Sequence, residues 1–406
     1  MLDQVLITLW IIWLVVGVGV AFFLAWNNGS NNAANAIGTA VGAHIISLRK
    51  ALVIAALFDF LGAVLFGSFV SRTLMKGIVD VTQIEDPKVI IAGMIGALLA
   101  TGLWVLGASI LKIPMSISQG IVGGVIGFGL AALGIRSIDW GLVSTIFISW
   151  AILPLASALI AMALYLLYSR MFRKERLMIH IGWSSVFLLV FSTVFLLMVK
   201  TLKLSDIRFA IMISGILGIV AILLFLAYVL VSQSASSVGR RNRIIYLLMV
   251  VAMASMSFSH GANDVANSAG PLTAIYLALK EGIVPSSVNV DLVMLMICAA
   301  GISIGILSWG SRVVGTIGEE ITTLTFASAF TAQLAASLTV LILTRLGMPV
   351  STTMSIVGAV SGVGLARGIR AVNVRTLLKI FGAWAIAVPV VAAGAAGIYT
   401  LLIMFI

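Results

Sequence analysis

Two short polar segments with the same pattern interrupt an otherwise apolar sequence. Residues Gly29–Gly38 read GSNNAANAIG, and residues Gly261–Gly270 read GANDVANSAG. Amides and a carboxylate at membrane depth are costly unless they bind a ligand or one another. Their oxygen atoms are the ligands that a hard cation such as sodium prefers. Two polar interruptions at matching places predict a duplicated transporter whose substrate site lies where they meet.

Hydroxyl residues follow proline in a second pair of matching segments. Residues Pro114–Gly123 read PMSISQGIVG, and residues Pro349–Gly358 read PVSTTMSIVG. A helix that begins after each proline leaves its first backbone N–H groups free. Together with the hydroxyls, these groups can bind an anion without a buried Lys or Arg. Back-bonding of the hydroxyls to helix carbonyls is the alternative, and we favour the anion site.

Composition sets the class of protein that must position these groups. Hydrophobic residues make up 62% of the 406 residues and charged residues 9%, with a mean hydropathy of +1.22. Apolar stretches of about 20 residues recur, each long enough to cross a bilayer. The net charge of +11 comes from bases scattered in short loops. That distribution is typical of membrane topology rather than nucleic-acid binding, so we expect a lipid bilayer as the environment and no nucleic-acid partner.

The duplication divides the chain into two repeats and a link. Besides the two motif pairs, Trp150-Ala-Ile matches Trp384-Ala-Ile. We therefore expect a first repeat over residues 1–170, two linking transmembrane helices with basic loops over 171–242, and a second repeat over 243–406. The two linking helices are expected at about 181–200 and 207–232.

Loop charges predict that the repeats have opposite orientations. The densest basic clusters, Arg170–Arg176 and Arg240–Arg243, flank the two linking helices and should both be cytoplasmic. An inverted repeat needs an odd number of crossings, so we expect five crossings plus one re-entrant or broken helix in each half. The short motif segments, about 28–46 and 262–279, are assigned to that role. The predicted fold is an all-α membrane protein with about 12 transmembrane helices and both termini extracellular.

Two signatures resemble a known family. HGANDVAN at 260–267, followed by GMPVSTT at 347–353, is similar to the paired signature of the inorganic phosphate transporter family, the sodium- or proton-coupled phosphate permeases. Thr316–Thr322 and Ala332–Ala335 also resemble that family's intervening sequence. The chain departs from the pattern at Asn32, where the family usually has Asp, and at Ser116–Gln119, where it usually has Ser-Thr-Thr-His. Both departures bear on the cation stoichiometry.

The resemblance implies a plasma-membrane symporter that imports phosphate with sodium and holds it near the midplane between the repeats. It implies no cofactor besides the co-transported sodium ions. We expect the phosphate ligands to be Ser116, Ser118, Gln119, Ser351, Thr352, Thr353, Asn32 and Asp264. We expect the sodium ligands to be Asn31, Asn32, Asn35, Asn263, Asp264 and Asn267.

Other polar residues carry weaker signals. Asp59 is the second acid placed well inside an apolar segment, and a structural and a functional role are equally compatible with it. His260 and His44 are interpreted as satisfied helix-end residues. Glu319 and Glu320 are interpreted as solvated residues at a membrane boundary.

Several alternatives remain open. Proton coupling can replace sodium coupling, and sulfate or another oxyanion can replace phosphate in the same fold. An anion channel would need an open pore with repeated filters or charged rings, and an enzyme would need a nucleophile with its base or a cluster of metal ligands. One Asp and no such ring argue against the channel, and one Cys with three scattered His offers neither requirement of the enzyme. Rocking and elevator motions, and a monomer and a homodimer, are all compatible with the sequence.

Overall fold

The fold is built entirely from helices. The computed structural model describes residues 2–68, 77–80, 83–201, 204, 206–231, 237–282, 284, 290–345 and 350–406. Within these ranges every named element is a helix, and a single isolated β-bridge joins Val79 to Ile138. Most of the buried apolar side chains belong to one continuous core. The prediction of an all-α protein is therefore confirmed.

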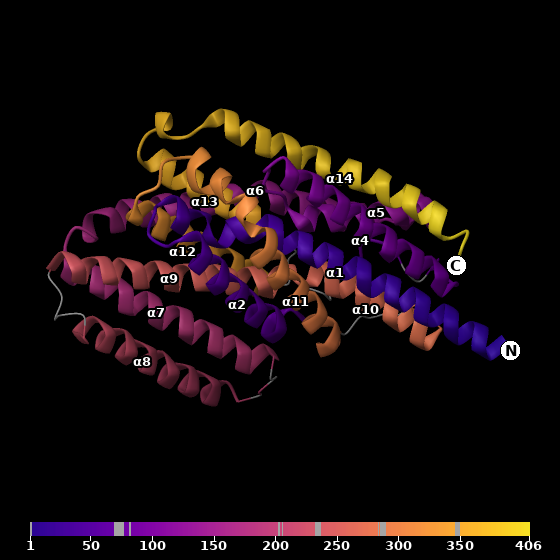
Figure 1. Cartoon of the computed structure of the whole chain (residues 1–406), viewed down its shortest axis with the longest axis horizontal. Coiled ribbons are helices and arrows are strands. Elements are labelled where there is room, and N and C mark those ends of the chain that lie inside the picture. The colour runs from indigo at the N-terminus through magenta and orange to yellow at the C-terminus, as the bar shows by residue number, and fades with distance from the viewer. Residues whose placement is uncertain are drawn as a thin grey trace.

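The α-helices follow one another along the chain (Figure 1). They are α1 (Leu2–Gly42), α2 (Leu48–Phe66), α4 (Pro87–Ile110), α5 (Ile117–Leu133), α6 (Trp140–Met171), α7 (Glu175–Leu196), α8 (Ile207–Val231), α9 (Ser237–Asp264), α10 (Ala266–Glu281), α11 (Leu292–Trp309), α12 (Phe326–Arg345), α13 (Thr352–Ala366) and α14 (Val374–Leu402).

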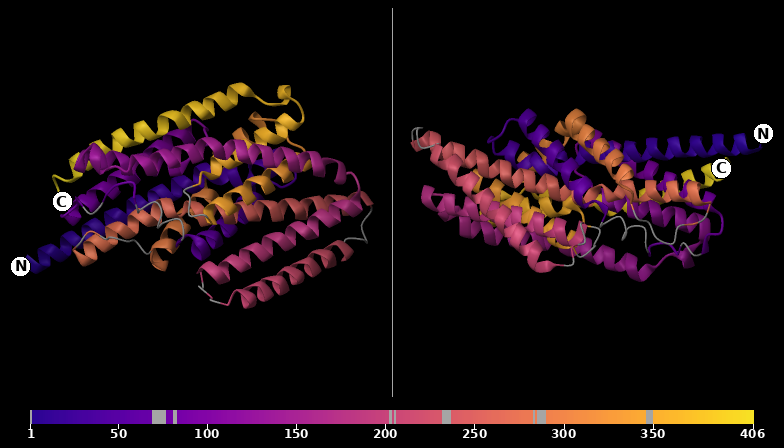
Figure 2. Two further views of the ribbon diagram at one scale, coloured as in Figure 1. Left: turned by 180° about the vertical axis from the view of Figure 1, so that it is seen from behind. Right: turned by 90° about the horizontal axis from the view of Figure 1, so that it is seen from below.

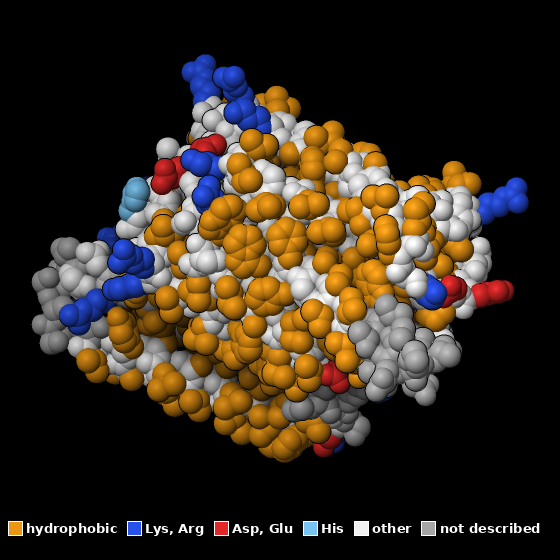
Figure 3. All heavy atoms as spheres, turned by 45° about the vertical axis from the view of Figure 1, so that its right-hand side comes forward, with side chains coloured by type: hydrophobic (Ala, Val, Ile, Leu, Met, Phe, Trp, Pro, Cys, Tyr) orange, Lys and Arg blue, Asp and Glu red, His pale blue; other side chains and the backbone are white. Residues whose placement is uncertain are grey.

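Many of these helices can cross a bilayer. Among the described residues, 8 helical stretches are long and apolar enough to do so. Three shorter apolar helices accompany them, over Ile117–Leu133, Phe326–Val340 and Thr352–Ala366. Figure 3 shows the matching surface, a broad belt of hydrophobic side chains with charged residues gathered at its margins. The chain is thus a multi-pass membrane protein, and the number of 12 crossings stays a prediction.

The prediction of a separate re-entrant helix over residues 28–46 is wrong. Helix α1 runs through the first motif without a break and ends at Gly42. It survives because amides of the motif bond to other helices rather than to the backbone of α1: Asn31 donates to Ser109 of α4 at 2.9 Å, and Asn32 donates to Asp264 of α9 at 3.2 Å. A polar side chain disturbs a helix mainly when it competes for backbone groups, and these side chains have other partners.

The second motif is interrupted at a single residue. Helix α9 ends at Asp264 and α10 begins at Ala266, with Val265 between them. The two form one continuous helical stretch, Gly239–Glu281, of 43 residues. The segment 262–279 is therefore also not a separate short helix, although the predicted break exists.

The short helices carry the Pro-Ser segments instead. Helix α5 has 17 residues and α13 has 15. Each packs against the helix before it, α4 or α12, so that α4–α5 and α12–α13 form two helical hairpins. The second helix of each hairpin begins at its serine and threonine residues, after N-cap Ser116 in α5 and N-cap Ser351 in α13.

The helices of the two predicted repeats pack reciprocally. Helix α1 packs against α11 while α2 packs against α9, and α5 packs against α14 while α6 packs against α13. Glycines allow the closest approaches: a Cβ atom on Gly29 would lie 1.9 Å from the carbonyl oxygen of Ile302, and one on Gly261 would lie 1.9 Å from that of Asp59. The same pattern of contact therefore occurs twice, at equivalent motif glycines.

The two linking helices form a peripheral pair. Helices α7 and α8 pack mainly against each other and lie along one edge of the bundle (Figures 1 and 2). The N-terminal and C-terminal ends of the chain lie together at the opposite end of the molecule from the start of α9. This arrangement places the basic residues at the starts of α7 and α9 far from both termini.

Candidate ion-binding site

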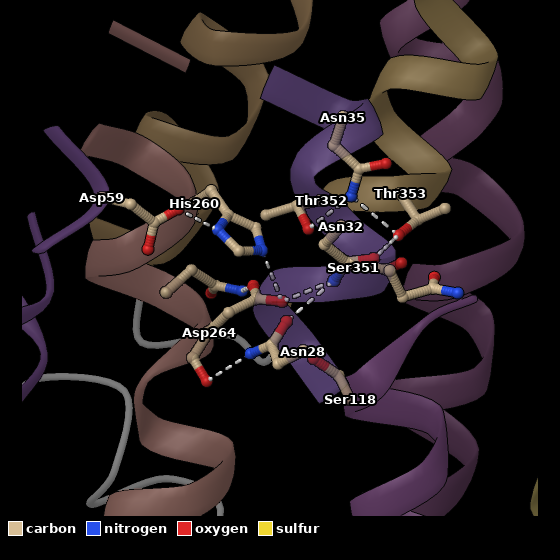
Figure 4. A network of polar contacts seen from close by, with 12 residues as sticks. Asn28, Asn32, Asn35, Asp59, Ser118, His260, Asp264, Ser351, Thr352 and Thr353 are labelled. Atoms are coloured by element: carbon tan, nitrogen blue, oxygen red, sulfur yellow. Dashed lines mark hydrogen bonds and ion pairs between the residues drawn. The ribbon is translucent and has the colours of Figure 1, made fainter. Parts of the chain in front are cut away.

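The two Asn-rich motifs meet inside the bundle. Asn32 of α1 donates to the Oδ2 atom of Asp264 of α9 at 3.2 Å, and Asn28 donates to the backbone carbonyl of Asp264 at 3.3 Å (Figure 4). All three side chains are buried. The predicted convergence of the motifs is therefore confirmed at atomic detail.

Asp264 is the centre of this contact. Its Oδ1 atom accepts a hydrogen bond from Asn263 at 2.7 Å, and its Oδ2 atom lies 3.3 Å from Nε2 of His260. Among the described residues, no Lys or Arg side chain is buried. Amide donors reduce the cost of burying a carboxylate but do not cancel its charge. The site can therefore hold a cation next to Asp264.

Asp59 and His260 extend the acidic centre into α2. The Nδ1 atom of His260 lies 2.5 Å from Oδ2 of Asp59, and each side chain is 1% exposed. His260 lies in the last turn of α9, as predicted, but it bridges two buried carboxylates rather than facing a membrane surface. The spacing of four residues between His260 and Asp264 places them on one helix face. No pattern in the sequence links them to Asp59.

Helices α5 and α13 begin at the predicted serines, and we call the starts of these two helices the hairpin tips. Ser116 accepts a hydrogen bond from the backbone N–H of Gln119 at 3.4 Å and caps α5, and Ser351 accepts one from Met354 at 3.2 Å and caps α13. These caps leave the other N–H groups of each first turn available. Pro349 lies outside the described residues, so its predicted role is not tested.

Hydroxyl groups join the tips to the first motif. Thr353 donates to the amide oxygen of Asn32 at 3.1 Å and lies within hydrogen-bond distance of the Met115 carbonyl at 2.8 Å. Asn35 donates to Thr353 at 2.9 Å and is 3.4 Å from the hydroxyl of Thr352. Two residues at the start of α13 thus contact the first motif, as Figure 4 shows.

Asn31 and Asn263 hold the hairpin tips in place. Asn31 accepts from the backbone N–H of Met115 at 2.7 Å and donates to the carbonyl of Ile113 at 3.0 Å. Asn263 donates to the carbonyl of Val350 at 2.7 Å, and Ser118 donates to the same carbonyl at 3.3 Å. These bonds give both amides a positioning role. Their role as sodium ligands stays a prediction.

Several buried polar atoms of the predicted site have no hydrogen-bond partner within the described chain. They are both side-chain polar atoms of Asn267, Oδ1 of Asn35 and Oε1 of Gln119. A buried polar atom without a partner is costly and needs an explanation. A bound polar ligand would supply the missing partners. No hydrogen bond joins Asn267 to the other predicted ligands.

Gln333 and Thr39 belong to the same polar region, although they were not predicted as site residues. Gln333 of α12 donates to the backbone carbonyl of Ala36 at 2.7 Å, and Thr39 donates to Oε1 of Gln333 at 2.5 Å. Both are fully buried. Gln333 falls in the segment that carries part of the family resemblance, but its spacing gives no independent signal.

Known proteins of similar sequence and structure share this architecture. The model of the phosphate transporter family matches residues 28–395. A protein from Thermococcus kodakarensis that is named a phosphate permease is 34% identical over 400 residues, covering 97% of this chain and 98% of that protein. One from Haemophilus influenzae is 32% identical over 397 residues, covering 94% of each.

A solved structure agrees with the sequence comparison. The chain described as the sodium-dependent phosphate transporter superimposes with a TM-score of 0.90 at 36% identity, covering 97% of this chain and 100% of that one. The family model, the curated relatives and this solved structure all point to a transporter rather than an enzyme. This chain belongs to the phosphate transporter family.

Proposed function

We propose that this protein is a secondary transporter that imports inorganic phosphate together with sodium. The main support is that both Asn-rich motifs meet at the buried carboxylate of Asp264, while Thr353 of the α13 hairpin tip bonds to Asn32 beside it. Membership of the family and the similarity to a sodium-dependent phosphate transporter point the same way. A cation and an anion that bind next to each other each raise the affinity of the other.

The proposed phosphate site lies between the two hairpin tips. Its ligands are the tip residues Ser116, Ser118, Gln119, Ser351, Thr352 and Thr353, together with Asn32 and Asp264. Free N–H groups at the starts of α5 and α13 attract the anion, and the unpartnered Oε1 of Gln119 can accept from a protonated phosphate oxygen. Sulfate has no such proton near neutral pH, so this contact favours phosphate.

The proposed sodium ligands surround Asp264. They are Asn31, Asn32, Asn35, Asn263, Asp264 and Asn267, whose side chains offer oxygen atoms. The unpartnered amide oxygens of Asn35 and Asn267 support the assignment. Proton coupling and an oxyanion other than phosphate remain the alternatives within this fold, and an anion channel is a less favoured class.

Inverted repeats are part of the same proposal. The reciprocal pairs α1–α11 and α2–α9, with equivalent glycines at their contacts, support two related halves over 1–170 and 243–406. With α7 and α8 as the link over 171–242, the proposed number of crossings is 12, and the ion site lies near the midplane between the repeats. We assign the protein to the plasma membrane.

Uptake into proteoliposomes tests the proposed function directly. An inward sodium gradient should drive phosphate accumulation, and excess sulfate should compete poorly. A proton gradient alone should drive little uptake. Phosphate uptake that depends on the proton gradient but not on sodium would indicate proton coupling. Phosphate uptake that depends on neither gradient would indicate a channel.

Alanine at the two hairpin tips should weaken phosphate binding. Each hydroxyl that bonds the charged substrate contributes roughly 1.5 to 3 kcal/mol, so Ser116→Ala and Thr352→Ala should each lower affinity about 10- to 150-fold. Ser116→Thr keeps both the hydroxyl and the helix cap and serves as the matched control. Sodium binding without phosphate should change little. Wild-type phosphate affinity in both alanine variants would place the anion elsewhere.

The topology gives a further expected result. On a Cys298→Ala background, an impermeant thiol reagent added outside should label Ile406→Cys and leave Lys174→Cys unlabelled. The two positions lie at opposite ends of the molecule, with Lys174 in the basic loop before α7. Labelling of Lys174→Cys from outside and of Ile406→Cys only after permeabilisation would reverse the assigned orientation.

A further inference from the structure

An apolar groove lies between α7 and the α2–α9 pair. Its volume is about 310 Å³, and its walls include Phe58 and Leu61 of α2, Leu189 and Val190 of α7, and Val251 and Phe258 of α9. The groove exists because α7 packs mainly on α8 and only lightly on the bundle. Within a bilayer, an empty groove of this kind would forfeit dispersion contacts on its whole surface. Hydrocarbon is therefore its natural occupant.

Basic residues gather at the end of α7 and α9 from which both helices begin. We call Arg170, Arg173, Lys174, Arg176, Arg240, Arg241 and Arg243 the basic collar. Contacts join its two parts: Nε of Arg240 lies 2.6 Å from Glu175, and Arg241 donates to the carbonyl of Phe172 at 3.3 Å. Seven bases and one acid, Glu175, leave a local charge of +6. The collar therefore attracts anions at the membrane surface.

The groove lies at acyl-chain depth below the collar. Val251 follows Arg243 by eight residues, and Leu189 follows Glu175 by fourteen, so they lie about 12 and 21 Å along their helix axes. One leaflet of hydrocarbon is about 15 Å thick. Val251 thus lies within the leaflet next to the collar and Leu189 at about the midplane, so a lipid whose phosphate contacts the collar reaches the near part of the groove with the end of its acyl chain.

We propose that the basic collar and the groove together bind one anionic phospholipid, with its phosphate at the collar and an acyl chain in the groove. Arginine side chains bind phosphate oxygens through charge-assisted hydrogen bonds. A zwitterionic lipid carries its own cation beside the phosphate and gains less from the collar. The proposal is independent of the substrate assigned above, because it needs only a membrane-spanning chain.

The occupied groove would support the candidate ion site. Phe58 precedes Asp59, and Phe258 lies two residues before His260. Phe258 also packs edge-on against Phe66, with ring centroids 5.3 Å apart. An acyl chain against these rings backs the α2–α9 contact that brings Asp59 to His260. Anionic lipid is therefore expected to raise the unfolding temperature of the protein as well as to bind it.

Native mass spectrometry of the purified protein tests this site with phosphatidylglycerol and phosphatidylcholine as probes. The wild type should retain phosphatidylglycerol in preference to phosphatidylcholine. Val190→Trp fills the groove and should lower that retention about tenfold or more. Leu159→Trp is the matched control, since Leu159 of α6 is 63% exposed, and this variant should retain the lipid. The triple variant Arg173→Gln/Arg176→Gln/Arg243→Gln should lose the preference between the two lipids.

Three results would overturn the proposal: equal retention of both lipids by the wild type, unchanged retention by Val190→Trp, or a preference that survives the triple variant. A change from dimer to monomer in Val190→Trp, with no change in bound lipid, would assign the groove to a second copy of the chain. If Val190→Trp does not fold, as judged by its unfolding transition, Val190→Phe fills the groove less and makes the same comparison.

Discussion

Asp264→Asn should reduce sodium-driven phosphate uptake at least roughly 100-fold, since a lost charged ligand costs about 3 kcal/mol. Both carboxylate oxygens accept hydrogen bonds, Oδ1 from Asn263 and Oδ2 from Asn32. Asparagine has one acceptor oxygen, so its NH₂ group would face one of these donors. The variant therefore loses the cation's charged ligand and also disturbs the contact between the two motifs.

The control for this variant is Asp139→Asn. It makes the same chemical change at the N-cap of α6, where asparagine caps as well as aspartate, and it should transport normally. Sodium-dependent phosphate uptake into proteoliposomes, normalised to the amount of reconstituted protein, measures both. Wild-type sodium dependence in Asp264→Asn would remove Asp264 from the cation site.

Gly261→Ala should abolish uptake by separating α2 from α9. The added Cβ would lie 1.9 Å from the carbonyl oxygen of Asp59, far inside van der Waals contact, so one of the helices must move. Overpacking of this kind costs about 1 to 3 kcal/mol, and backbone contacts such as this one fall at the upper end. The movement also draws Asp59 away from His260, the residue next to Gly261.

Gly107→Ala provides the comparison within another transmembrane helix. A Cβ on Gly107 of α4 meets no atom within 4 Å, and alanine is the better helix former. This variant should keep its uptake and its unfolding temperature in detergent, whereas Gly261→Ala should lose both. Normal uptake by Gly261→Ala would mean that α2 and α9 can separate without harm to the site.

Several residues of the candidate site could be predicted from the sequence, because burying their polar groups among apolar residues costs free energy unless they have partners. Asn32, Asn35 and Asp264 stand out in apolar sequence, and their duplication indicates that they meet. Ser116 and Ser351 were expected where a helix begins, and each caps the helix that begins there. These inferences need only local composition and a repeat.

Other features could not be predicted, since they depend on partners far away in the sequence. Polar content suggested that the first motif forms its own short helix, yet Asn31 is satisfied by Ser109 and by the α4–α5 tip, and α1 continues through it. The contact between Asp59 and His260 spans 201 positions. A hydrogen-bond partner of that kind has no signature in one sequence.

The packing of helices of the first half against helices of the second half also affects how the protein is made. Helices α1 and α2 leave the ribosome before α9 and α11, against which they pack most closely. The glycine-containing faces of α1 and α2 therefore contact lipid or an insertion chaperone in the bilayer until the second half has been translated. Assembly of this core is consequently a late event in biogenesis, and a ribosome that stops within residues 1–170 releases a half without its partners.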